Sequence, residues 1–189
     1  MDFKEDIETS IKVLRAGGVI LYPTDTVWGI GCDATNKEAV EKIFEIKKRE
    51  GSKSLIALAS DAGMLNRFVK DIPAQAWDLM EVSDSPLTIV YDSPRGLAAN
   101  VLADDGSMAL RIPDDEFCKR LIHRLGKPLI STSANKSGEP APLCFNEINN
   151  EIKTAVDHVV RWRQNDTAPG RPSAIIKLRS NGEVTIIRK

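Results

Sequence analysis

Polar side chains that could bind or activate a small molecule follow directly after a short apolar run. Residues 19–22 are nearly continuous in apolar character and are expected to form a buried strand that ends at Pro23. Residues 24–31 then bring hydroxyls, a carboxylate and two glycines. At the carboxyl end of a strand, such groups are typical of small-molecule sites. The same residue types are common in hydrogen-bonded turns, in which Trp28 would be a core anchor, so both interpretations stay open.

Positive charges are concentrated at Lys47, Lys48 and Arg49, with Lys53 a short loop later. Cations that converge could hold a polyphosphate, because the guanidinium of an arginine binds two oxygens at once and a lysine acts as a point charge. The run also suits the end of a helix, where cations interact favourably with the helix dipole. The alternative is a solvated helix end balanced by nearby glutamates, since charge runs usually face water.

Arg111 lies among apolar residues in the strand-like segment 108–112. A buried arginine needs an anionic partner, because an unpaired charge is costly to remove from water. The alternative is an exposed side chain on an edge strand. The sequence alone leaves these two placements open.

Residues 131–138 form a run rich in hydroxyl and amide side chains, again after a strand-like segment. Such a loop can offer hydroxyls and backbone N–H groups to phosphate or carboxylate oxygens. It could equally be a turn that satisfies its own backbone. The patterns GxxxxGK[ST], GxGxxG and GxSxG do not occur, which excludes a Walker loop, a dinucleotide fingerprint and a hydrolase nucleophile elbow.

The elements that must position these segments follow from hydrophobic periodicity and from chain breakers. Apolar residues at helical spacing predict a first helix over residues 3–14. Asn36 is a candidate N-cap for a second helix, and Asp114 for a later one that reaches residue 125. Strands are expected at residues 55–58, 87–91, 108–112 and 128–131, with one or two helices around 61–81 and a hairpin over 173–187. Alternating helices and strands, together with adjacent strands, predict a mixed α/β sheet.

Size and charge limit the classes of protein that the chain can represent. Its 189 residues, 42% hydrophobic and 28% charged, suffice for one domain, expected to span residues 1–189. The net charge of −1 indicates no general affinity for nucleic acid, so an anion site must be built by a few local cations. The three cysteines lie far apart, and no apolar run approaches the roughly 20 residues that cross a bilayer. With an N-terminus unlike a signal peptide, these features predict a reducing, cytoplasmic setting without a membrane.

Together, in this order and spacing, the segments resemble the threonylcarbamoyl-AMP synthase family, with its YrdC-like fold. The similarity covers nearly the whole chain and is most specific where YPTDTxxG, KxR and STSAN occur together. The matching pieces are residues 17–34, Lys47 and Arg49 followed by Lys53, residues 110–113, Ser133 and Asn135 within STSANKSGEP, residues 172–175, and Ile187-Arg188.

The resemblance implies an enzyme, a nucleotidyltransferase that joins L-threonine, bicarbonate and ATP into threonylcarbamoyl-AMP with release of pyrophosphate. Its fold would be a twisted, mixed parallel and antiparallel sheet with flanking helices and a large, positively charged concave cavity. Magnesium would accompany ATP, and the product would pass to a separate tRNA threonylcarbamoyl transferase complex that modifies tRNA. RNA contact is a further expectation, and no membrane partner is implied.

The resemblance also implies roles for individual residues. Thr26, Arg111 and Ser131 would face L-threonine. Lys47 and Arg49 would hold the ATP phosphates and carry catalysis. The other residues expected near the nucleotide are Lys53, Ser107, Ser133, Asn135 and Arg188, and no side chain is expected to bind a metal directly.

The sequence departs from the family pattern at Glu50, Leu58 and Trp28, which stand where many relatives carry a proline, a histidine and a tyrosine. At residues 161–163 an Arg-Trp-Arg stretch replaces an acidic, glycine-rich one. This cation–aromatic surface, together with a positive cavity, leaves an RNA-binding, translation-associated module as an alternative function. Carbamoyl transfer in hydrogenase maturation is a further alternative, because a YrdC-like domain occurs inside those larger proteins.

Overall fold

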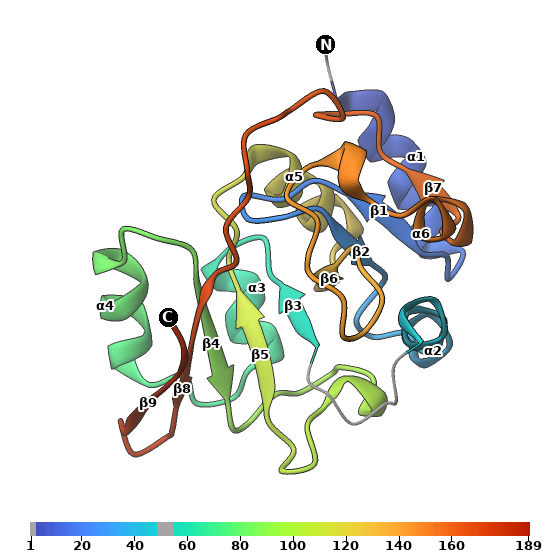
Figure 1. Cartoon of the computed structure of the whole chain (residues 1–189). Helices are drawn as coiled ribbons and strands as arrows, with labels where there is room; N and C mark the ends of the chain where they lie inside the picture. The colour runs from blue at the N-terminus through green and yellow to red at the C-terminus, as the bar shows by residue number, and fades with distance from the viewer. Residues whose placement is uncertain (1–2, 49–54) are drawn as a thin grey trace.

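One mixed sheet with flanking helices runs through the computed structural model, which describes residues 3–48 and 55–189 (Figure 1). The helices are α1 (Lys4–Arg15), α2 (Lys37–Lys47), α3 (Ala62–Phe68), α4 (Ala74–Val82), α5 (Glu116–Leu125) and α6 (Asn150–Ala155), with 3₁₀ turns η1 (Ala99–Val101) and η2 (Phe145–Glu147). The strands are β1 (Ile20–Tyr22), β2 (Gly29–Gly31), β3 (Ile56–Leu58), β4 (Leu87–Tyr91), β5 (Met108–Arg111), β6 (Leu129–Ser133), β7 (His158–Val159), β8 (Ala174–Leu178) and β9 (Val184–Arg188).

The sheet contains both parallel and antiparallel strand pairs. Among the described residues the strand order is β7-β1-β2-β6-β3-β5-β4-β8-β9. The pairs β1–β7, β3–β5 and β4–β8 are parallel, and the other neighbours are antiparallel. Strand β6 pairs with β2 on one side and β3 on the other, which places Ser131 and Ser133 inside the sheet. The mixed α/β sheet that the sequence predicts is therefore confirmed.

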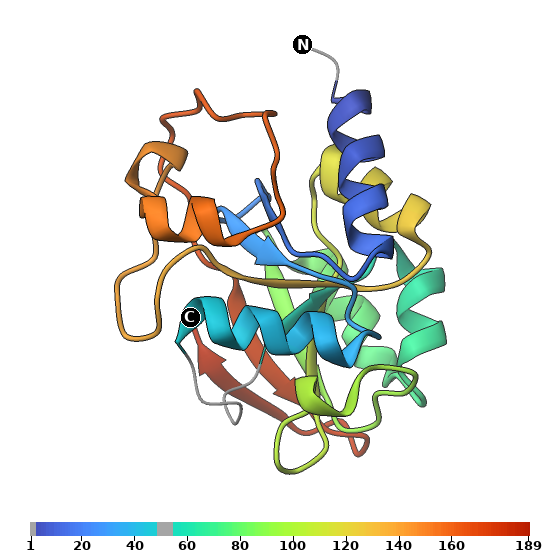
Figure 2. The same cartoon turned by 90° about the vertical axis from the view of Figure 1, so that its right-hand side faces the viewer.

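The helices pack on the sheet through apolar faces with the expected spacing. In α1 the buried positions include Ile7 and Leu14, and this helix packs against α5 (Figure 2). The residue that caps α5 is Asp115, one position beyond the expected Asp114. Its Oδ1 accepts a hydrogen bond from the backbone N–H of Cys118 at 2.8 Å. None of the helices within the described ranges is long and apolar enough to span a membrane.

Strand β2 is absent from the predicted elements. The glycine-rich end of the polar segment, Gly29–Gly31, pairs with both β1 and β6. A Cβ on Gly31 would lie 2.4 Å from the carbonyl oxygen of Ile130, so only glycine lets these two strands approach so closely. Residues 24–26, which carry the hydroxyls and the carboxylate, therefore sit in a tight connection between paired strands.

Helix α2 begins as the sequence predicts, and its last residue enters the core. The Asn36 side chain accepts a hydrogen bond from the N–H of Ala39 at 3.0 Å. Lys48, at the C-cap, adopts a left-handed conformation with φ of 49° and ends the helix. The preceding Lys47 is only 2% exposed. A solvated helix end is therefore the wrong interpretation for Lys47.

The C-terminal hairpin closes one edge of the sheet, as the sequence predicts. Strand β8 pairs with β4 and with β9, and Gly182 supplies the turn with φ of 86°. The apolar side chains of Ile186 and Ile187 on β9 are 61% and 57% exposed. The last residues of this edge strand nevertheless reach the cavity described below.

Replacement of Asn36 by alanine removes the N-cap of α2, the helix that carries Lys47. We expect the free energy of unfolding to fall by about 1 kcal/mol, because the N–H of Ala39 loses its acceptor. Urea denaturation followed by circular dichroism measures the change. Glu45→Ala, at an exposed position of the same helix, is the control and should change the free energy by less than about 0.5 kcal/mol. Equal changes in the two variants would contradict the capping role.

Candidate substrate-binding cavity

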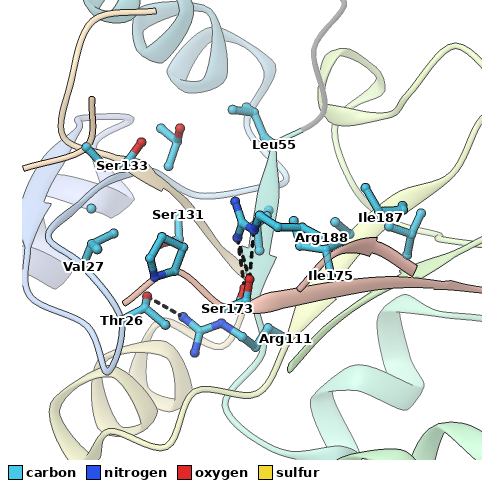
Figure 3. A pocket seen from close by; sticks show the side chains of 17 residues that line it. Thr26, Val27, Leu55, Arg111, Ser131, Ser133, Ser173, Ile175, Ile187 and Arg188 are labelled. Atoms are coloured by element: carbon cyan, nitrogen blue, oxygen red, sulfur yellow. Dashed lines mark hydrogen bonds between the residues drawn. The ribbon is translucent and has the colours of Figure 1, made fainter. Parts of the chain in front are cut away.

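An open cavity of about 370 Å³ lies where β2, β3, β5, β6 and the β8–β9 hairpin come together. Its polar wall includes Thr26, Arg111, Ser131, Ser133 and Arg188 (Figure 3). Its apolar wall includes Val27, Ile56, Pro172, Ile175 and Ile187. Segments that are far apart in the sequence thus meet at one place, and the residues expected to face threonine are all among them.

Arg111 is buried beside this cavity and has an anionic partner. Its side chain is 3% exposed, and its Nη1 lies 2.6 Å from each carboxylate oxygen of Asp25. Its Nη2 donates a hydrogen bond to Thr26 Oγ1 at 3.3 Å. Of the two placements that the sequence left open, the buried and paired one is correct.

Thr26 belongs to a chain of hydroxyl groups. Thr24 Oγ1 lies 2.7 Å from the carbonyl oxygen of Val27 and 2.9 Å from Thr26 Oγ1. A hydroxyl carries one hydrogen, and Thr24 donates its own to Val27, so Thr26 must donate to Thr24. One lone pair of Thr26 Oγ1 then accepts from Arg111, and the other can accept a hydrogen bond from a ligand.

The segment between β7 and β8 crosses the loop that carries Thr26 and braces it. Arg163, with φ of 63°, donates to the carbonyl oxygen of Thr24 at 3.2 Å and pairs with Asp115 at 3.1 Å. Gly170 packs so closely that a Cβ would lie 2.0 Å from the carbonyl oxygen of Thr26. The Arg-Trp-Arg stretch that departs from the family pattern therefore supplies one of the contacts that hold this loop.

The buried ammonium of Lys47 holds the loop that follows β6. Its Nζ donates to the carbonyl oxygens of Ser133 at 2.6 Å and Asn135 at 2.7 Å, and lies 3.5 Å from Asn135 Oδ1. The carbonyl oxygen of Lys47 accepts from the N–H of Ser137 at 2.9 Å. Among the described residues that line the cavity, Ser133 is present and Lys47 is not. In this structure Lys47 thus supports the SxN segment from behind the cavity wall.

The SxN segment satisfies much of its own hydrogen bonding, which agrees with the turn interpretation. Ser133 Oγ donates to Asn135 Oδ1. Asn135 Nδ2 donates to the carbonyl oxygens of Lys136 at 3.0 Å and Glu139 at 2.6 Å. Asn135 lines a separate neighbouring pocket with residues 140–143. Ser133, whose hydroxyl oxygen can still accept hydrogen bonds, is the member of the motif that faces the cavity.

Arg188 reaches the cavity from β9. Its Nε and Nη2 donate to the carbonyl oxygen of Ser173 at 3.0 and 2.7 Å, which leaves Nη1 for a ligand. Partial burial lowers the pKa of its guanidinium, because the charged form loses contact with water. Ser173 is itself fixed, since its Oγ lies 2.8 Å from the buried Thr88 Oγ1.

Three further residues expected near the nucleotide, besides Lys47 and Asn135, are not placed on this cavity. Ser107 precedes β5, at the opposite end of that strand from Arg111, and its hydroxyl donates to Asp105 at 2.6 Å. Arg49 and Lys53 lie outside the described residues. The residues that the structure describes contain no group of three or more His, Cys, Asp or Glu side chains that could hold a metal ion.

Sequence reasoning missed two residues that shape the cavity. Asp25 stands between the two threonines of the TDT motif. A carboxylate next to the predicted site residue Thr26 was the one feature of the sequence from which its pairing with Arg111 could have been expected. Gly29 borders Ser131 so closely that a Cβ would lie 3.0 Å from Ser131 Oγ. Nothing in the sequence indicates which atom a glycine will approach.

Comparison with known proteins identifies relatives along almost the whole chain. The Sua5/YciO/YrdC family, described as telomere recombination, matches residues 12–189. A curated threonylcarbamoyl-AMP synthase from Pseudoalteromonas translucida is 34% identical over 85% of this chain and 87% of its own length. Another of the same name, from Stutzerimonas stutzeri, is 35% identical over 94% of this chain and 95% of its own length.

Solved structures show the same fold. Sua5 of P. abyssi, complexed with L-threonine, is 26% identical and superimposes with a TM-score of 0.82 over 94% of this chain, which spans only 52% of that longer protein. YciO of E. coli has a TM-score of 0.84 over 98% of this chain and 89% of its own, and at 22% identity it shows the fold alone. From the family match and from relatives above 30% identity, the chain belongs to the Sua5/YciO/YrdC family.

Proposed function

We propose that the chain is a threonylcarbamoyl-AMP synthase, a nucleotidyltransferase that converts L-threonine, bicarbonate and ATP into threonylcarbamoyl-AMP and pyrophosphate. Its similarity to the curated relatives of that name supports the proposal. In the structure the observation that carries it is the cavity, where a buried arginine, several hydroxyls and a second arginine meet. An apolar wall with a few converging polar groups suits an amino acid and a nucleotide.

The end of the cavity at Arg111 suits the amino acid. Because Nη1 is bound to Asp25, the edge formed by Nε and Nη2 remains for a carboxylate, which a guanidinium binds through two parallel hydrogen bonds. The oxygen of Thr26 can accept from an amine or a hydroxyl, and Ser131 offers a further hydroxyl on the same wall. We place L-threonine beside these three side chains.

The end of the cavity at Ser133 and Arg188 suits ATP. Nη1 of Arg188 supplies a donor and a positive charge, and Lys47 holds the SxN loop in place behind the wall. The resemblance adds Arg49, Lys53, Ser107 and Asn135 to the proposed nucleotide contacts. Magnesium would accompany ATP and would supply positive charge to its phosphates.

The proposed reaction needs no nucleophile from the protein. Bicarbonate yields carbon dioxide and hydroxide, and the hydroxide takes the proton of the threonine ammonium. The amine then attacks carbon dioxide, a C–N bond forms, and the carbamate gives up a proton to water. A carbamate oxygen attacks the α-phosphorus of ATP, the bond to the bridging oxygen of the β-phosphate breaks, and pyrophosphate leaves. Catalysis would rest on positioning and on cations that face the charge developing at phosphorus.

We further propose that residues 1–189 act as one domain in the cytoplasm and that the product passes to a separate tRNA threonylcarbamoyl transferase complex. Two expectations stay predictions: direct RNA contact, and the alternative role in carbamoyl transfer. The proposal on the product follows from its chemistry, because a mixed carbamic–phosphoric anhydride is reactive toward an amine and needs an acceptor.

Incubation with ATP, magnesium, L-threonine and labelled bicarbonate tests the proposed reaction. We expect a labelled adenylate and pyrophosphate to form only when threonine is present. L-Serine should be used less well, because it lacks one methyl group, whose burial stabilises a complex by about 1 kcal/mol. Pyrophosphate release that does not depend on an amino acid would contradict the proposal.

Gly29→Ala tests the placement of threonine. The added methyl would lie 3.0 Å from Ser131 Oγ on the cavity wall. We expect the KM for threonine to rise about tenfold and the KM for ATP to change less than about twofold, because only the space beside Ser131 is narrowed. Initial rates at varied threonine and varied ATP separate the two effects.

Gly63→Ala, in α3, is the matched control. Its added Cβ would lie at the same distance, 3.0 Å, from a side-chain oxygen, here Oδ1 of Asp61. It should leave both KM values unchanged. If Gly29→Ala raised the two KM values equally, threonine would not lie beside Ser131.

Lys47→Met tests whether the buried ammonium orders the SxN loop. The carbonyl oxygens of Ser133 and Asn135 would lose a charged donor, so we expect the free energy of unfolding to fall by about 2 kcal/mol. ATP-dependent turnover should fall by roughly 100-fold, because the nucleotide wall is displaced. Lys48→Met removes the same group from the exposed next position and should leave turnover within about twofold. Wild-type turnover in Lys47→Met would show that the loop does not need this contact.

A further inference from the structure

A second cavity of about 520 Å³ adjoins the first across the pair formed by Asp25 and Arg111. Asp25 lines this second cavity together with Ile112 and Asp114, whereas Arg111 lines the first. The carboxylate of Asp25 therefore does not belong to the wall that faces the proposed substrates. The side chain of Asp25 contacts that wall through Arg111.

The carboxylate is held from two sides. Both of its oxygens lie 2.6 Å from Arg111 Nη1, and Oδ2 also accepts a hydrogen bond from the backbone N–H of Asp114 at 2.9 Å. The side chain of Asp25 is 9% exposed and that of Arg111 is 3% exposed. Little water is available to replace either partner, so the pair restricts rotation of the guanidinium.

This pairing decides which donors of Arg111 remain for a ligand. A guanidinium has five N–H groups in a fixed fork. Those on Nη1 are directed to Asp25, and Nη2 uses one hydrogen on Thr26 Oγ1. The donors that remain are the N–H of Nε and the second N–H of Nη2, two neighbouring atoms whose N–H groups can bind the oxygens of a carboxylate.

We propose that Asp25 is a positioning residue that holds Arg111 with its Nε–Nη2 edge toward the carboxylate of threonine. The proposal rests on the proposed function, because it assumes that an amino acid occupies the cavity. Asp25 also neutralises the charge of Arg111, so recognition at this end depends on directed hydrogen bonds more than on net charge. A neutral pair attracts a triphosphate less than a lone arginine would, which helps to keep ATP at the Arg188 end.

A double-mutant cycle with Asp25→Asn and Arg111→Met tests the proposal, with threonine and ATP affinities measured by isothermal titration calorimetry. Asparagine keeps the shape of the side chain but removes its charge. We expect Asp25→Asn to weaken threonine binding roughly tenfold and to change ATP binding less than about twofold. In the Arg111→Met background, Asp25→Asn should change threonine affinity less than about twofold, because a residue that acts through Arg111 has nothing left to position.

Asp114→Asn is the matched control, since this neighbouring aspartate has a 99% exposed side chain and contacts Asp25 through its backbone N–H alone. It should leave both affinities unchanged. Asp25→Glu is a second variant in case the asparagine variant folds poorly. It keeps the charge but displaces the carboxylate, and it should bind threonine with an affinity between those of wild type and Asp25→Asn.

Two results would overturn the positioning role. One is an equal loss of threonine and ATP affinity in both Asp25 variants, which would indicate a general structural defect. The other is an Asp25→Asn effect that persists undiminished in the Arg111→Met background. A wild-type protein that binds threonine but forms no adenylate would contradict the proposed function alone, because the cycle reads binding and not turnover.

Discussion

A cation can be buried only when oxygens of the protein replace the water that it loses, and this constraint joins the walls of the cavity. The ammonium of Lys47, at the end of α2, is held by the carbonyl oxygens of Ser133, at the end of β6, and of Asn135 just after it. The guanidinium of Arg111, on β5, is held by Asp25 from the connection between β1 and β2. These contacts span 86 to 88 positions of the sequence. The two buried cations thus join segments of the cavity wall that lie far apart in the sequence.

The polar groups around the cavity are largely bound to one another, so its shape is set before a ligand enters. Thr24 and Thr26 share a chain of hydroxyls, Arg163 braces the same loop, and the SxN turn binds its own carbonyl oxygens. Groups that are held in this way need little reorganisation when charge develops in a transition state. A protein of net charge −1 can therefore present donors to anions at one place without a strongly basic surface.

Much of the fold could be predicted from the sequence. Core-facing residues follow the helical period in α1 and α2, β5 is a short apolar run, and a turn signal at residues 180–182 marks the C-terminal hairpin. Strand β2 could not be predicted, because two of its three residues are glycines, which have no side chain to give an apolar–polar alternation. It is recognised only by its hydrogen bonds to β1 and β6. In the segment after β1, Trp28 is the core anchor that one interpretation predicted, since it packs on Phe145 at 4.8 Å between ring centroids. Thr26 nearby lines the cavity, and its role in binding stays a prediction. The motifs predicted that Thr26, Arg111 and Ser131 lie close together, and all three line the cavity. The direction of the Lys47 side chain could not be predicted, because it depends on carbonyl oxygens that any residue at those positions would supply.

The position of β9 has a practical consequence for handling the protein. Ile187 and Arg188 line the cavity, yet they belong to an exposed edge strand and directly precede Lys189. A purification tag, a reporter domain or a surface tether joined after Lys189 would start beside the cavity mouth and could pair with the open edge of the sheet. Attachment before α1, which Figure 1 shows at the opposite end of the molecule from β9, keeps such additions away from the cavity.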